Sequence, residues 1–166
     1  MSANPPAPAT VPLTTADIEI ATRAADAFTR IYYAAYDSTS RLSELPKLYR
    51  PSSALVWNGT PFQGPEGVVS MVQSMPPTKH EIQSFDCHPI PGTSPPSLLV
   101  IVSGSVTHGL GAAGNPSGTS SKNKEGHPRV FSQTFMLVPD SEAPPPSKAG
   151  ELAKYFVSAD ALRFVG

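Results

Sequence analysis

The stretches LLVIVSGSVTH at 98–108 and RVFSQTFMLV at 129–138 decide the fold class. The first is apolar and then alternates, while the second alternates throughout, which is the period of a β-strand. Two further segments, 79–89 and 154–164, complete a series of four long strands. Both faces of these strands are partly apolar, and a sheet that is buried on both faces indicates oligomerisation.

The half of the chain before these strands predicts helices. Thr14 with Asp17 three residues later resembles a capping box, with Asp in place of the usual Glu. Apolar residues then recur at helical spacing as far as about Asp37. A shorter helical piece follows over 42–48. A third helix over 64–75 has Pro at its first position and ends at a Pro-Pro pair.

A short hairpin separates the second and third helices. The run ALVW at 54–57 predicts a strand, and Asn58-Gly59 is the dipeptide favoured in a two-residue turn, so 60–62 forms the return strand. Helices grouped ahead of an antiparallel meander predict an α+β fold. In it, three N-terminal helices pack on one face of a strongly curved antiparallel sheet.

Chain length and the distribution of Pro set the expected domain organisation. One domain with a hydrophobic core fits 166 residues, and a second would be cramped. We expect this single domain over 14–166, after a disordered leader rich in Pro and Ala over 1–13. Two extended loops, 109–128 and 139–150, are rich in Gly, Ser, Pro and Lys, and loops of that length are usually functional or disordered.

Charge and cysteine content exclude several classes of function. Twelve Lys and Arg against 13 Asp and Glu give a net charge of −1, which argues against a protein that grips a phosphate backbone by itself. Cys87 is the single cysteine, so we expect no disulfide, no cysteine-based metal site and a reducing compartment. The histidines show no metal-ligand spacing. No apolar run approaches the roughly 18 residues of a membrane span.

One further motif carries no cofactor prediction. GLGAAG at 109–114 matches a dinucleotide fingerprint in its letters, but it does not lead into a helix that could bind a phosphate. We therefore expect neither a cofactor nor a metal.

Several short segments, taken in order, carry a resemblance to a known family. They are Phe28 with Tyr32-Tyr33 and Asp37, Leu48-Tyr49, LVWNG at 55–59, FDCHP at 85–89, LVIVSGSV at 99–106, RVFSQTF at 129–135 and DALRF at 160–164. Their order and spacing resemble the nuclear transport factor 2-like superfamily. Within it they resemble the small subunit of the heterodimeric nuclear mRNA export receptor, in a fungal-like version with longer loops.

This resemblance implies a cone-shaped fold and a non-catalytic role. The small subunit would bind the matching domain of a TAP-type large subunit, sheet against sheet, and support the export of mRNA, with pre-ribosomal particles as a further cargo. Phe-Gly-repeat nucleoporins would be contacted mainly through that partner, and RNA indirectly or weakly. The implied location is the nucleus and the nuclear pore, with shuttling to the cytoplasm. No membrane and no small-molecule substrate are implied.

The resemblance also implies where the partner contacts lie. Arg163 matches the arginine that this family places on the sheet face at the heterodimer interface, paired with a partner aspartate. Arg suits this role because its guanidinium binds a carboxylate with two hydrogen bonds. Further contacts are expected on the sheet at Phe131, Gln133, Phe135, Ser103, Ser105 and Asp160. Alternation does not decide which face fills the cone and which meets the partner.

Two other functions stay open within the superfamily. A cavity enzyme, resembling its isomerases and dehydratases, needs a carboxylate or His base in an apolar pocket opposite a donor. The candidates are Asp86, His88, Tyr32, Tyr33 and Asp160. We favour structural or interface roles for them, and expect Asp86 and His88 at the edge of the sheet and Trp57 in the core. The other alternative is a homodimeric nuclear import carrier for a small GTPase.

A small basic group lies in and beside the first long loop. Lys122, Lys124 and Arg129 stand near His127. A solvated loop is the default interpretation, and a weak contact to RNA or an acidic cargo is the minority one.

Overall fold

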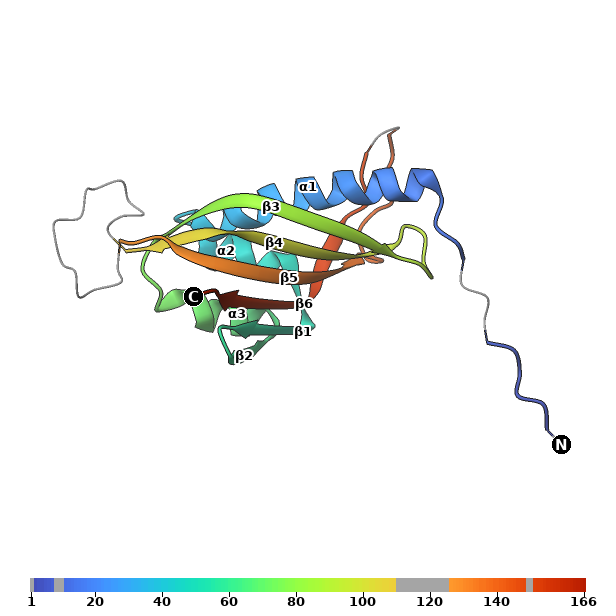
Figure 1. The fold of residues 1–166 in the computed structure, drawn as a ribbon, viewed down its shortest axis with the longest axis horizontal. Helices are drawn as coiled ribbons and strands as arrows, with labels where there is room; N and C mark the ends of the chain where they lie inside the picture. Colours follow the sequence, from blue (N-terminus) through green and yellow to red (C-terminus); the bar gives the residue numbers. More distant parts are fainter. Residues whose placement is uncertain (1, 8–10, 110–125, 149–150) are drawn as a thin grey trace.

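The computed structural model describes residues 2–7, 11–109, 126–148 and 151–166, and within them three α-helices pack against one six-stranded sheet (Figure 1). The elements are α1 (Thr15–Asp37), α2 (Arg41–Glu44), the 3-10 turn η1 (Leu45–Leu48), β1 (Tyr49–Trp57), β2 (Thr60–Gln63), α3 (Gly64–Gln73), β3 (Thr78–Ile90), β4 (Ser97–His108), β5 (Arg129–Pro139) and β6 (Tyr155–Phe164). No helix in the described part of the chain is long and apolar enough to cross a membrane.

Local sequence signals place the first helix and the first hairpin as predicted. The capping box is confirmed, since the N–H of Asp17 donates to Oγ1 of Thr14 and the N–H of Thr14 donates to the Asp17 carboxylate. Asn58 and Gly59 have φ angles of 45° and 92°. This left-handed conformation is the one that a two-residue hairpin turn requires.

The strand order β2-β1-β6-β5-β4-β3 corrects one expectation. The four long strands form the expected antiparallel meander, but β6 runs parallel to β1, so the sheet is mixed. This pairing joins strands separated by the whole meander, and no local pattern signals a contact of that range. The α+β class with three helices on a curved sheet is confirmed.

The core lies between α1 and the sheet. Helix α1 runs alongside β3 over one side of the sheet (Figure 1), and we call the face that it covers the inner face. The rings of Phe28 and Tyr32 meet the ring of Phe135 with centroids 5.1 Å and 4.7 Å apart. Such edge-to-face pairs stabilise by about 1 kcal/mol each beyond their buried area, so they fix the helix on β5.

The Arg41 side chain of α2 contacts the end of α3. The guanidinium of Arg41 donates to the carbonyls of Val72, Met75 and Pro76 at the end of α3. Val72 lies in the last turn of the helix, and Met75 and Pro76 follow it. Carbonyls at a helix end lack the usual N–H donor four residues later, so a side-chain donor can satisfy them. Arg41 therefore ends α3 and anchors the connection to β3.

An irregularity in β3 requires a glycine on β4. The register between the two strands shifts between Ile82 and Ser84, which leaves Gln83 as an extra residue. Beside this bulge, a Cβ on Gly104 would lie 2.2 Å from the carbonyl oxygen of Glu81. Backbone atoms cannot approach a side chain so closely, so Gly104 allows the bulge to form.

Gly104→Ala tests this close approach. The added methyl group forces β3 and β4 apart, and we expect a loss of about 1–3 kcal/mol in the free energy of unfolding, as in overpacked cores. Urea titration followed by circular dichroism measures the loss. Ser105→Ala, one residue along β4 on the opposite face, is the matched control and should change stability by less than about 0.5 kcal/mol. Equal stability of the two variants would contradict the account.

Candidate functional site

The structure separates the predicted interface residues by face. Phe131, Gln133, Phe135 and Asp160 are buried on the inner face, so they contact the chain itself. Their assignment to a partner surface is corrected by this burial. Ser103, Ser105 and Arg163 lie on the opposite face of the sheet.

On the inner face, five side chains from four elements form one hydrogen-bond network. The Asp160 carboxylate accepts from the Tyr49 hydroxyl at 2.5 Å and from Nε2 of Gln133 at 3.4 Å. The Tyr32 and Tyr49 hydroxyl oxygens are 2.8 Å apart, and Gln133 also donates to Tyr32. The Tyr33 hydroxyl donates to Oε1 of Gln133 at 2.8 Å. The network joins α1, β1, β5 and β6.

Burial controls the protonation of this network. It raises the pKa of Asp160 to about 6, although the hydrogen bonds from Tyr49 and Gln133 lower the pKa in part. Burial above all raises the pKa values of Tyr32, Tyr33 and Tyr49 well above that of a free tyrosine. The three hydroxyls therefore remain protonated donors at neutral pH.

The composition of the network resembles an acid–base site, but its geometry is closed. A catalytic base must come within hydrogen-bond distance of a substrate atom. Here the polar atoms contact one another, and no buried side-chain nitrogen or oxygen in the described residues lacks a partner. Asp86 and His88 are exposed on β3, the edge strand of the sheet, and Asp86 faces Ile101 of β4. Of the five candidate catalytic residues, the structure brings Tyr32, Tyr33 and Asp160 together in the network, whereas Asp86 and His88 lie apart from it.

A second polar cluster ties the end of α1 to β3. The Asp37 carboxylate accepts from the hydroxyl of Thr78 at 2.8 Å and from the backbone N–H of His80 at 2.7 Å, and it lies 2.6 Å from Nδ1 of His80. The bonds from His80 and Thr78 lower the pKa of Asp37 against the opposing effect of burial. No group of three or more potential metal-ligating side chains occurs among the residues described by the structure.

The outer face of the sheet, opposite α1, has a different composition. On β4, β5 and β6 it includes Leu99, Ile101, Ser103, Ser105, Thr107, Val130, Ser132, Thr134, Met136, Val138, Phe156, Ala159, Ala161 and Arg163. These side chains are small or apolar. Arg163 alone among them carries a charge, and it lies opposite Ser132 in the β5–β6 register.

The centre of the outer face carries no charged side chain. Ile101, Thr134 and Ala161 form a row across β4, β5 and β6. Ile101 is 37% exposed and Val130 is 51% exposed, although both are β-branched strand residues suited to burial. An uncharged surface of this kind fits contact with another protein.

The predicted basic group is only partly described. Lys122 and Lys124 lie outside the described residues. The guanidinium carbon of Arg129 lies 3.6 Å from the centroid of the Phe164 ring, which is a cation–π contact. The ring of Phe164 also packs edge-to-face with the ring of Trp57, with centroids 5.5 Å apart. Trp57, expected in the core, is partly buried.

Sequence reasoning did not identify Tyr49 and His80 as parts of the polar clusters. Tyr49 meets Asp160 across 111 residues, and His80 meets Asp37 across 43. The only local signal is the residue type: Tyr49 and His80 occupy inward-facing strand positions, where the alternating pattern requires only an apolar side chain.

Comparisons with known proteins agree with this geometry. The profile of the Nuclear transport factor 2 (NTF2) domain matches residues 24–164. NTF2-related export protein 1 of Bos taurus is 30% identical over 147 residues, which cover 87% of this chain and 88% of that protein. A chain of the complex between the Chaetomium thermophilum Mex67 NTF2-like domain and Mtr2 has a TM-score of 0.64 at 20% identity, covering 88% of this chain and 99% of its own.

The same fold also occurs in a protein described as an enzyme. The putative scytalone dehydratase of Novosphingobium aromaticivorans has a TM-score of 0.65 at 12% identity, covering 92% of this chain and 89% of its own. At that identity the likeness concerns the fold alone. The fold therefore does not choose between a transport factor and an enzyme.

Asp160→Asn tests the network through pH. The pKa of Asp160 is about 6 in the folded state against 3.8 for the free group, so its contribution to stability is fully present below about pH 4 and is lost as the pH rises through 6. Two pKa units correspond to about 3 kcal/mol. The Asn side chain of the variant carries no charge at any of these pH values, and its amide can still hydrogen-bond with the Tyr49 hydroxyl. Between pH 4 and pH 7, the free energy of unfolding of wild type should therefore fall by about that much relative to the variant.

The measurement is urea unfolding of both proteins at several pH values, with circular dichroism as the check that both are folded. Other carboxylates titrate equally in the two proteins and cancel in the difference. A difference in unfolding free energy that stays constant over this range would contradict the assignment of a buried, shifted carboxyl.

Proposed function

The chain belongs to the nuclear transport factor 2 (NTF2) domain family and is related to nuclear export factors, and on that premise we propose that it is the non-catalytic small subunit of an mRNA export receptor. In this proposal it heterodimerises through the outer face of its sheet with the NTF2-like domain of a larger subunit. The complex supports the passage of mRNA, and of pre-ribosomal particles, through nuclear pores.

The observation that carries the proposal is the outer face itself. It is built from small and apolar side chains on β4, β5 and β6, with Arg163 as their one charged residue. Small residues let a second sheet approach closely, and the apolar centre gains free energy when water leaves it. A single cation in such a surface favours a partner that supplies one carboxylate.

Arg163 provides specificity in this arrangement. Its exposed guanidinium would form a bidentate pair with an aspartate of the larger subunit, and sheet-to-sheet contact would exclude water from the pair. Removing one member of a buried pair costs about 3–5 kcal/mol, because the other charge is left without a partner. Binding also stabilises the folded larger subunit by mass action.

The closed inner network supports a non-catalytic role. Tyr32, Tyr49, Gln133 and Asp160 bond with one another, whereas an enzyme of this fold needs its carboxylate and donor to face a substrate. The relatives named as transport factors include NTF2-related export protein 1, which supports a location at the nucleus and the nuclear pore. Contacts to Phe-Gly nucleoporins are proposed mainly for the larger subunit.

A homodimeric nuclear import carrier is the second candidate. Nuclear transport factor 2 of Davidiella tassiana is 29% identical over 143 residues, so the relatives include a protein named as a nuclear transport factor as well as export proteins. A homodimer would use the same outer face, and it would place identical surfaces against each other. The two candidates therefore differ in the partner that occupies the face. The mass of the purified complex distinguishes a heterodimer with a larger subunit from a homodimer of this chain.

Arg163→Asp tests the heterodimer. We expect the variant to lose at least about 3 kcal/mol of binding free energy for the NTF2-like domain of the larger subunit, because two carboxylates would then face each other. Isothermal titration with the purified domain, followed by sizing of the complex, measures the loss. Arg23→Asp, an exposed charge reversal on α1, is the matched control and should bind as wild type does. A stable homodimer indifferent to Arg163 would instead favour the import carrier.

Thr134→Arg tests the apolar centre of the same face. Thr134 lies between Ile101 and Ala161 in the register and points outward, so a long charged side chain there fits the isolated chain but not a docked sheet. Binding of the larger subunit should fall by at least about tenfold while the midpoint of thermal unfolding stays within a few degrees of wild type. Undiminished binding would place the partner elsewhere.

A further inference from the structure

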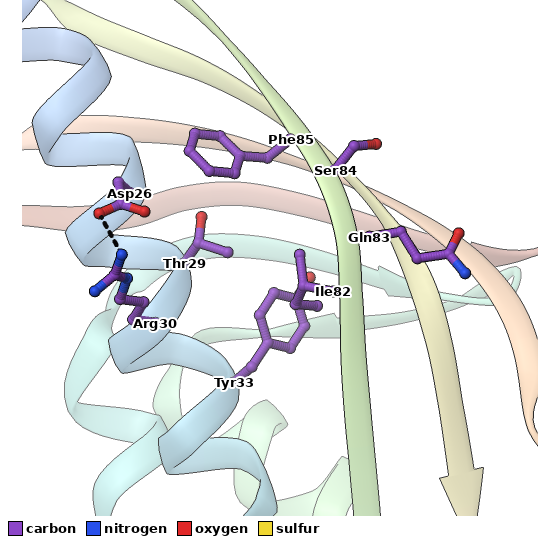
Figure 2. Close-up of a pocket in the computed structure, with 8 residues that line it drawn as sticks. All are labelled: Asp26, Thr29, Arg30, Tyr33, Ile82, Gln83, Ser84 and Phe85. Carbon is purple, nitrogen blue, oxygen red and sulfur yellow. Dashed lines mark ion pairs between the residues drawn. The ribbon is translucent and has the colours of Figure 1, made fainter.

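A groove opens between α1 and β3 on the side of the sheet away from β1. Figure 2 shows Thr29 and Tyr33 of the helix facing Ile82 and Phe85 of the strand, with the Asp26–Arg30 pair beside them on the helix, while Gln83 and Ser84 point away from the helix. The groove encloses about 450 Å³. That volume is sufficient for one or two bulky side chains.

The floor of the groove is apolar and its rim is neutral overall. Ile82 and Phe85 are half-buried, and Tyr33 and Thr29 close the floor. On the rim, Arg30 pairs with Asp26 at 3.2 Å, and the side chains of the pair are 79% and 45% exposed. The charges of this pair cancel, so a ligand of low net charge fits the groove.

One wall of the groove is an open strand edge. Among the described residues, strand β3 is the last in the sheet order, with β4 on one side and no strand on the other. Just before β3, the carbonyl of Pro77 accepts a hydrogen bond from the N–H of Gly109, which follows β4. Pro77 therefore turns its backbone carbonyl toward β4. In an antiparallel ladder, alternate residues turn their N–H and C=O outward, which places His80 and Ile82 outward. Beyond the extra residue Gln83, the outward positions become 85, 87 and 89.

The chain itself already supplies a partner at one end of this edge. The outward N–H of His80 donates to the Asp37 carboxylate at 2.7 Å. At the far end, the outward position 89 is a Pro, which has no N–H to leave unpaired. Ile82, Phe85 and Cys87 lie between these two ends, beside the groove.

We infer that this edge and groove form a second docking surface, which accepts an extended peptide segment of another protein as an added strand beside β3. The main chain of the peptide pairs with the outward groups of Ile82, Phe85 and Cys87. One bulky apolar side chain enters the groove above Ile82 and Phe85. Main-chain pairing supplies affinity and the groove supplies selectivity, as in other sites between a helix and a sheet edge.

The chemistry of the site defines this partner. A segment rich in Pro does not fit, because it cannot donate to the open carbonyls. Strong net charge is not favoured either, because the rim pair is already neutralised. The expected segment is therefore extended, free of Pro, low in charge and centred on a bulky apolar residue. The inference does not depend on the function proposed for the outer face, which lies on other strands.

The test uses an acetylated and amidated heptapeptide, Thr-Val-Thr-Phe-Thr-Val-Thr, as the probe. Amide hydrogen exchange of the wild-type chain is followed by nuclear magnetic resonance with and without it. We expect the amides of Phe85 and Cys87 to exchange rapidly in the free chain and at least about tenfold more slowly with the probe bound. The same peptide, N-methylated at alternate residues so that it cannot pair with the edge, should leave them unchanged.

Two substitutions at one position separate edge pairing from mere contact. Cys87→Pro removes an outward N–H at an edge position where Pro is tolerated, and Cys87→Val keeps the N–H with a similar apolar side chain. Both should fold, which circular dichroism checks. The Pro variant should bind the probe at least about tenfold more weakly than the Val variant. Arg163→Asp should bind it as wild type does, whatever its effect on the larger subunit.

Several outcomes would overturn the inference. Equal affinities of the Pro and Val variants would show that the edge is not used. Slow exchange of Phe85 and Cys87 in the free chain would show that the edge is already closed, and protection that grows with protein concentration would make a second copy the occupant. Absence of binding up to about 1 mM probe would also reject a peptide site of useful affinity.

Discussion

The Asp160 carboxylate is the point on which the interior of the fold depends. Donors from β1 and β5 converge on it, and Gln133 and Tyr49 connect it to α1 through the Tyr32 hydroxyl. A buried ionised group is tolerated when such donors replace water. The same network fills the inner side with aromatic rings and hydroxyls, so α1 is fixed on the sheet in one position.

This filled interior directs function to the opposite side of the sheet. Side chains alternate in direction along a strand, so the large residues Phe131 and Phe135 inside are interleaved with Ser132 and Thr134 outside. The small outer residues leave apolar area exposed in the described part of the chain, and a second protein can bury that area. The interior and the proposed partner surface are therefore two consequences of one alternation.

The sequence predicted the elements well and the two faces poorly. A cap such as Thr14 with Asp17, and a turn such as Asn58-Gly59, act within a few residues, so local chemistry is sufficient to place them. Alternation along a strand defines two faces but does not tell which one α1 covers. That choice depends on the size of the side chains that α1 must accommodate. Likewise, the pairing of Tyr49 with Asp160 follows from the parallel contact of β1 with β6, which no local pattern encodes.

The two proposed surfaces belong to one sheet, and this relation has a physical consequence. Arg163 lies on β6, which β5 and β4 separate from the open edge of β3. A face-docked subunit and an edge-added strand therefore need not compete for the same atoms. A strand added at the edge would widen the outer face by about 4.8 Å. A docked subunit that reaches this border would touch the added strand. Each ligand would then change the affinity of the other by the same free energy, since coupling between sites is reciprocal.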